Sequence, residues 1–118
     1  MWDIEFYETQ NDKVPVNEFL DSLNIKMKAK AFKDISILSE FGKDLREPYC
    51  KYIKDGVFEL RIKFASDISR IFYFFYIDNK IILTNGFIKK TQKTPTNEIS
   101  KALKYKADYE RRAKNEEL

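Results

Sequence analysis

Four basic residues in the second half of the chain are spaced so that a sheet could bring them together. Arg61 lies in the middle of an alternating segment, Arg70 begins a long apolar segment, and Lys89 and Lys90 directly follow the next one. If these segments are neighbouring antiparallel strands, the last hairpin pairs Arg70 roughly with Phe87. The four cations would then lie near one another, and we treat them as a candidate anion site.

Such a cluster suits phosphodiester chemistry. Arginine has a planar fork that can hold the non-bridging oxygens of a phosphate, and fixed cations stabilise the extra charge of its transition state. A lysine crowded by other cations has a lowered pKa and could exchange a proton near neutral pH. Glu59 could instead be the base, or could orient Arg61. Since RNA supplies its own nucleophile, the 2′-hydroxyl, this chemistry needs no metal and no other cofactor.

The strand predicted at residues 57–64 is apolar on one face and mostly polar on the other. Residues 55–56 are Asp-Gly, the signature of a type I′ turn, so a two-residue hairpin should precede this strand. That register sets Lys54 opposite Val57, Tyr52 opposite Glu59 and Cys50 opposite Arg61, and opposed residues share a face. The candidate RNA contacts are therefore Tyr52, Lys54 and Lys63, with Gln92 and Lys93 added by the basic block after the last strand.

The remaining patterns predict the elements that position these residues. We expect strands at 2–7, 49–54, 57–64, 70–77 and 81–88, helices from Pro15 and over 25–41, and a last helix with Thr94 as its cap and Pro95 first. The apolar stripe of the second helix is expected to be Ile25, Ala29, Phe32, Ile35 and Leu38. Gly86 predicts a bulge or a close approach within its strand. The order indicates a single α+β domain over residues 1–118, with about 110–118 frayed.

Composition sets limits on the class of protein. The 118 residues carry 22 Lys and Arg against 19 Asp and Glu, and the net charge of +3 by itself says little about partners. One cysteine and no histidine exclude an intramolecular disulfide and a Cys/His metal site. Cys50 is expected to pack, because no histidine can activate it. With no signal peptide pattern and no long apolar run, we expect a cytoplasmic protein without a membrane partner.

Three segments of the chain resemble one known family. Phe58-Glu-Leu-Arg61, Arg70-Ile-Phe-Tyr73 and Gly86-Phe-Ile-Lys-Lys-Thr-Gln-Lys-Thr-Pro95 look like the phage-derived, HigB-like branch of the RelE/ParE toxin superfamily. The early run Pro15-Val-Asn-Glu-Phe-Leu20 is also similar. The resemblance implies a RelE-like microbial RNase fold, with an N-terminal helical hairpin packed on a twisted antiparallel sheet and a C-terminal helix.

The resemblance also implies an activity and its partners. The protein would be the toxin of a type II toxin–antitoxin system and would cleave mRNA on the ribosome. A cognate HigA-like helix-turn-helix antitoxin would neutralise it, in a complex expected to be a heterotetramer. The implied catalytic residues are Arg61, Arg70 and Lys90, with Lys89 adjacent. Glu59 stands where RelE has a lysine, Tyr105 is a loose counterpart of a helical tyrosine, and the histidines of some HigB members are absent.

Three other interpretations stay open at this point. Lysines and arginines on a sheet face are often only solvated, and lysines also protect edge strands from aggregation. The same fold could serve a ParE-like gyrase poison, since fold does not fix function. The basic face could also dock RNA or protein without any catalysis.

Overall fold

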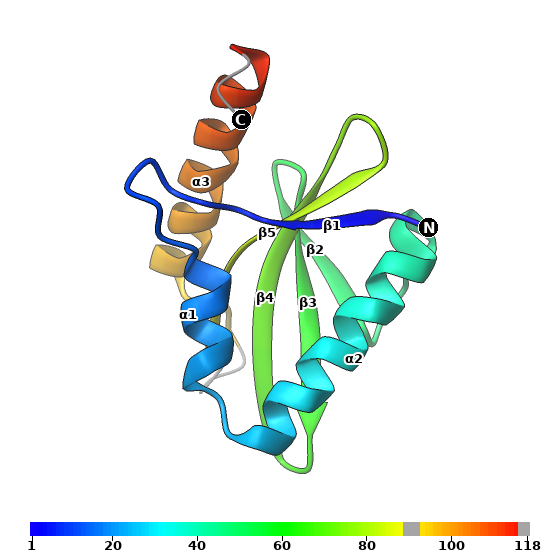
Figure 1. Ribbon diagram of the computed structural model, residues 1–118. Helices are drawn as coiled ribbons and strands as arrows, with labels where there is room; N and C mark the ends of the chain where they lie inside the picture. The colour runs from blue at the N-terminus through cyan, green and yellow to red at the C-terminus, as the bar shows by residue number, and fades with distance from the viewer. Residues whose placement is uncertain (89–92, 116–118) are drawn as a thin grey trace.

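A computed structural model describes residues 1–88 and 93–115 of the chain (Figure 1). In chain order the described elements are β1 (Asp3–Phe6), α1 (Pro15–Ser22), α2 (Ile25–Phe41), the 3₁₀-helix η1 (Gly42–Asp44), β2 (Cys50–Lys54), β3 (Val57–Phe64), β4 (Asp67–Tyr76), β5 (Lys80–Ile88) and α3 (Thr96–Lys114). The predicted α+β class is confirmed for this part of the chain.

The sheet is mixed, which corrects the expectation of a wholly antiparallel sheet. Its strand order is β1-β5-β4-β3-β2, and β2 to β5 form an antiparallel meander. β1 pairs with β5 in parallel, with Asp3 opposite Lys80 and Phe6 opposite Leu83. Two α-helices and strands β2 to β4 separate β1 from β5 in the sequence, and a connection of that length allows parallel pairing.

Helices cover both faces of the central strand, as its apolar composition predicted. Ile71 and Tyr73 of β4 are buried in a core shared with α1 and α2. Phe72 and Phe74 point the other way, into two clusters that α3 covers. Side chains alternate between faces along a strand, so a strand buried on both sides reads as a continuous apolar run.

The expected N-terminal helical hairpin is not confirmed. The chain begins with β1, and α1 and α2 diverge from the short turn that joins them (Figure 1). α1 packs mainly on β5, whereas α2 packs mainly on β3. The two helices therefore cover different parts of the same sheet face.

The bounds predicted for α2 are confirmed, but only the C-terminal part of its expected apolar stripe is buried. Ile35 and Leu38 are buried as expected. Ile25 is 84% exposed and Phe32 is 45% exposed, however, and in the first half of the helix Met27 and Ala31 are buried instead. Asp34 lies on that buried face at 1% exposure and is reached by the Lys30 ammonium at 2.7 Å. The stripe that we expected avoided both charges. The i,i+4 ion pair lets Asp34 be buried beside Ile35 and Leu38.

α3 begins one residue later than expected, with Pro95 as its N-cap and no side-chain cap. It continues past residue 110, where we expected the chain to fray. Arg112 is 7% exposed, and its two terminal nitrogens each donate a hydrogen bond of 2.8 Å to the backbone carbonyl oxygen of Glu8. This contact fixes the last turns of the helix. None of the described helices combines the length and apolar character needed to cross a membrane.

The predicted irregularity at Gly86 is confirmed. The pairing of β4 with β5 shifts register between Ile71, opposite Gly86, and Tyr73, opposite Leu83. A Cβ atom built at Gly86 would lie 2.3 Å from Cδ2 of the Phe19 ring in α1. Glycine is therefore required here for the close approach of α1 to β5.

We predict that Gly86→Ala lowers the free energy of unfolding by about 1–3 kcal/mol, because the added methyl group overpacks the contact with Phe19. Urea denaturation measures the loss. The double variant Phe19→Leu/Gly86→Ala should lose less than the sum of the two single variants, since the smaller side chain makes room. Strict additivity would contradict the assigned contact.

Candidate functional site

The structure brings two of the predicted cations together at one place on the sheet. Arg61 of β3 and Arg70 of β4 are directly opposite one another, and Arg70 is also opposite Phe87 of β5, as expected. Arg61 shares a face of β3 with Val57, and Arg70 shares a face of β4 with Phe72. Val57 and Phe72 pack against α3, so both arginines lie on the α3 side of the sheet.

Glu59 and Arg70 form a buried ion pair beside Arg61. Nε of Arg70 lies 3.1 Å from Oε1 of Glu59, and the two side chains are only 2% and 1% exposed. Burial lowers the pKa of Arg70, the charge of Glu59 opposes this effect, and the charge of Arg61 adds to it. Glu59 is therefore buried and, among the described residues, forms its ion pair with Arg70 and not with Arg61.

The pair is poorly hydrogen-bonded. Within the described part of the chain, no hydrogen-bond partner is found for Glu59 Oε1 and Oε2 or for Arg70 Nε and Nη1. The ions are close enough to attract but are not aligned as donor and acceptor. Buried polar groups are normally satisfied, so this is an unusual and costly arrangement.

Arg61 is the more accessible of the two arginines. It is partly exposed, and Lys63, two residues along the same face, is exposed. Lys54 is also exposed and lies opposite Val57, as predicted. These three residues stay candidates for phosphate contacts, and none of them is buried.

Tyr52 is on the opposite side of the sheet from the one expected. Asp55 and Gly56 have the positive φ values of a type I′ turn, 50° and 85°. The register then slips at Ile53, so that Tyr52 is opposite Phe58 rather than Glu59. The Tyr52 ring meets the Phe58 ring edge-on at 5.2 Å.

The slip has a physical reason. Ile53 is the extra residue of a β-bulge, and its side chain packs with the apolar cluster beneath α3. By the same slip Cys50 lies opposite Leu60 instead of Arg61. Cys50 is a buried free cysteine whose Sγ lies 3.4 Å from the carbonyl oxygen of Leu45, in keeping with a packing role.

Part of the predicted basic site cannot be placed. Lys89, Lys90 and Gln92 lie outside the described residues. The last described residue before them, Ile88, pairs with Ser69 next to Arg70. Lys93 is described and exposed.

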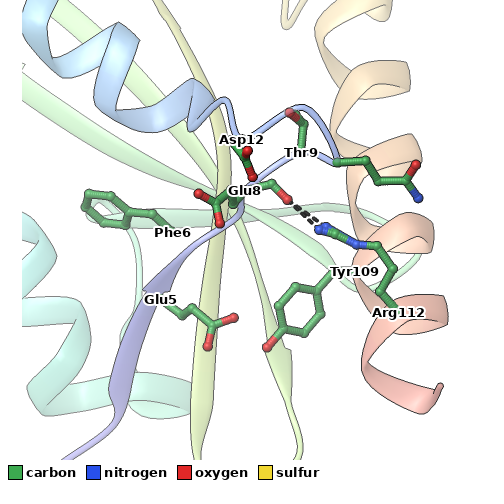
Figure 2. Close-up of a pocket in the computed structure, with 8 residues that line it drawn as sticks. Glu5, Phe6, Glu8, Thr9, Asp12, Tyr109 and Arg112 are labelled. Atoms are coloured by element: carbon green, nitrogen blue, oxygen red, sulfur yellow. Dashed lines mark hydrogen bonds between the residues drawn. The ribbon is translucent and has the colours of Figure 1, made fainter. Parts of the chain in front are cut away.

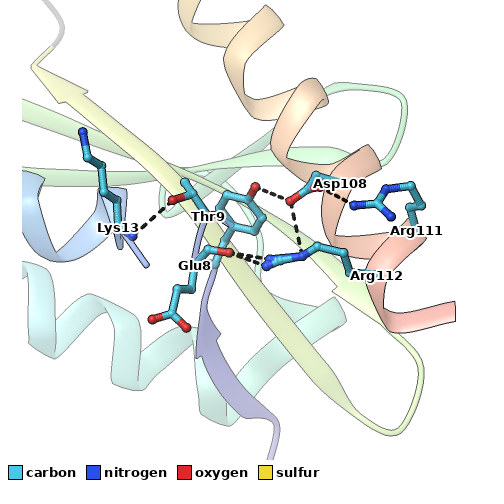
Figure 3. A network of polar contacts seen from close by, with 7 residues as sticks. Glu8, Thr9, Lys13, Asp108, Arg111 and Arg112 are labelled. Carbon is cyan, nitrogen blue, oxygen red and sulfur yellow. Dashed lines mark hydrogen bonds and ion pairs between the residues drawn. The ribbon is translucent and has the colours of Figure 1, made fainter. Parts of the chain in front are cut away.

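Tyr105, the loose counterpart of the helical tyrosine of RelE, packs against Tyr7. Its ring stacks on that of Tyr7 at 4.7 Å between centroids. Tyr7 in turn donates a hydrogen bond to Asp108, and Asp108 pairs with Arg111 at 3.2 Å and with Arg112 at 3.6 Å (Figure 3). The sequence reading missed this network, because residues 7 and 108 are brought together only by folding.

A hollow of about 540 Å³ beside this network is acidic (Figure 2). Glu5, Glu8 and Asp12 line it, and the Arg112 guanidinium is tied to the Glu8 carbonyl oxygen. Burial and the neighbouring Glu5 raise the pKa of Tyr109 at its wall. The carboxylates would repel a phosphate here, so the anion site is better sought at Arg61. No metal-binding group of His, Cys, Asp or Glu is found among the described residues.

Comparison with protein families gives one match. The family described as "Phage derived protein Gp49-like (DUF891)" matches residues 18–107, which is more than half of the chain. The matched segment runs from α1 into α3 and includes Glu59, Arg61 and Arg70. None of the curated proteins compared with the chain matches it.

We predict that Arg70→Met destabilises the protein by about 3–5 kcal/mol, because it leaves the Glu59 carboxylate buried without a cation. The double variant Glu59→Leu/Arg70→Met should recover most of this loss, since it removes both buried charges. Chemical denaturation of the three proteins measures the difference. If the double variant were no more stable than Arg70→Met, the assignment of Glu59 and Arg70 as a buried ion pair would be wrong.

A second prediction concerns acid stability. Burial alone would raise the pKa of Asp108, but the hydrogen bonds from Tyr7 and Arg111 and the charges of Arg112 and Arg111 hold it below its usual value. Asp108 therefore stabilises the fold above its unfolded pKa of about 3.9, and this contribution is lost as the pH falls through the lower folded value.

Wild type should accordingly lose stability below about pH 4 more steeply than Asp108→Asn. Urea denaturation of both proteins between pH 7 and pH 3 measures the two slopes, with pH 7 as the reference. Parallel slopes would show that Asp108 does not make this contribution.

Proposed function

The chain belongs to the phage-derived Gp49-like family, and from this premise we propose that it is the toxin of a type II toxin–antitoxin system. Its proposed activity is ribosome-dependent cleavage of mRNA. The observation that carries the proposal is the pair of arginines, Arg61 and Arg70, opposite one another on neighbouring strands. The sequence resemblance to HigB-like toxins supports it independently.

The proposed chemistry is an attack by the RNA on itself. The 2′-oxygen bonds to phosphorus while the bond to the 5′-oxygen breaks, and a proton moves from the first oxygen to the second. Arg61, partly exposed on the sheet face, would contact the non-bridging oxygens and stabilise their growing charge. Lys89 and Lys90 are the proposed groups for proton transfer.

The partners are part of the same proposal. A HigA-like helix-turn-helix antitoxin would bind the toxin and stop cleavage, in a heterotetrameric complex. The RNA contacts would be made by Lys54 and Lys63 on the described sheet face, together with Gln92 and Lys93. Tyr52 is no longer proposed as a contact on that face, because it lies on the other side of the sheet.

The direct test is to add the purified protein to ribosomes programmed with a defined mRNA and to map the new RNA ends. We expect discrete cuts that require the ribosome. An intact transcript would contradict the endonuclease proposal. A gyrase poison would leave the mRNA intact and instead give cleaved DNA in the presence of gyrase, so a parallel gyrase reaction separates the two activities.

We predict that Arg61→Ala lowers the cleavage rate about 100-fold, the usual cost of removing one group that stabilises transition-state charge. The matched control is Arg46→Ala, which removes the same charge from an exposed residue between η1 and β2. It should cleave within about twofold of wild type. Equal loss in both variants would indicate a general charge effect rather than a site at Arg61.

A further inference from the structure

The second arginine of the site is not free to bind a phosphate. The Arg70 side chain is 2% exposed, and its Nε lies 3.1 Å from Oε1 of the oppositely charged Glu59. Its neighbour across the strands, Arg61, is accessible. A phosphate that binds Arg61 would therefore lie beside the Arg70 guanidinium, which is buried and already paired with Glu59.

The occupying carboxylate is a poor partner. Among the described residues, Arg70 Nη1 and both oxygens of Glu59 find no hydrogen-bond partner. A pair held only by attraction forgoes the aligned, two-point contact that arginine makes with carboxylates and phosphates. A phosphate that makes this two-point contact with Arg70 would form hydrogen bonds that Glu59 does not form.

We infer that Glu59 competes with the substrate phosphate for Arg70. Arg70 stays paired with Glu59 until a phosphate displaces the carboxylate. This inference rests on the proposed function and adds a regulation of the same site. Glu59 is a positioning residue here, since it acts through Arg70 and touches no reacting atom. In the bound state Arg70 would join Arg61 on the phosphate, and Glu59 would lose its partner.

The inference differs from a plain charge effect in one respect. Removing any carboxylate near a basic face strengthens the binding of anions. If Glu59 acts by occupying Arg70, however, its removal should matter only while Arg70 is present. A double-mutant cycle between the two positions measures this dependence.

The probe is a short single-stranded DNA oligonucleotide, which has the phosphates of RNA but lacks the 2′-hydroxyl and is not cleaved by the proposed chemistry. Binding is measured by fluorescence anisotropy at one fixed salt concentration. We predict that Glu59→Gln binds about tenfold more tightly than wild type. In the Arg70→Met background the same substitution should change the affinity by less than about twofold.

Two results would overturn the inference. One is an affinity of Glu59→Gln no higher than that of wild type, including the case in which neither protein binds. The other is an equal gain in affinity from Glu59→Gln in the wild-type and Arg70→Met backgrounds, which would indicate a plain charge effect. Since the probe is not cut, these outcomes are independent of the ribosome assay, whose failure would instead contradict the proposed nuclease.

A measurement on the wild-type protein covers the case in which a variant does not fold. The Arg70 Nε–H signal, observed by NMR, should shift when the oligonucleotide is added and should exchange faster with water as the pair opens. The Arg61 signal should shift in the same titration. If Arg61 responds at saturation while Arg70 stays unchanged, Glu59 is not displaced and the inference is wrong.

Discussion

The burial of β4 on both faces is the constraint on which the rest of the structure depends. Ile71 and Tyr73 require cover on one side and Phe72 and Phe74 on the other. α1 and α2 supply the first layer, and α3 supplies the second. The middle of this strand has no solvent on either side, so a polar side chain there must find its partner within the protein.

Arg70 meets this requirement only in part. It lies in the buried strand at 2% exposure and is paired with Glu59 without a hydrogen bond. A pair of this kind contributes little stability compared with apolar side chains of the same size. The proposed role of the guanidinium at the point where Arg61 faces Arg70 offers a reason for its presence there.

Local patterns in the sequence were sufficient to predict most elements but not all of their faces. The turn at Asp55-Gly56 was predicted because its two residues favour positive φ. The bulge at Ile53 was not, because it arises from packing beneath α3, and it moves Tyr52 to the other side of the sheet. The predicted stripe of α2 was right at Ile35 and Leu38 but missed the burial of Asp34, whose charge is met by the Lys30 ammonium four residues earlier.

The sequence by itself determined the α+β class, the antiparallel meander from β2 to β5 and the register that sets Arg70 opposite Phe87. These follow from side-chain periodicity and turn chemistry, which act over a few residues. Only the tertiary structure decided that β1 joins in parallel, that Glu59 pairs with Arg70, and that Tyr7 meets Asp108. Such contacts join distant segments, and their energy depends on burial that no local pattern specifies.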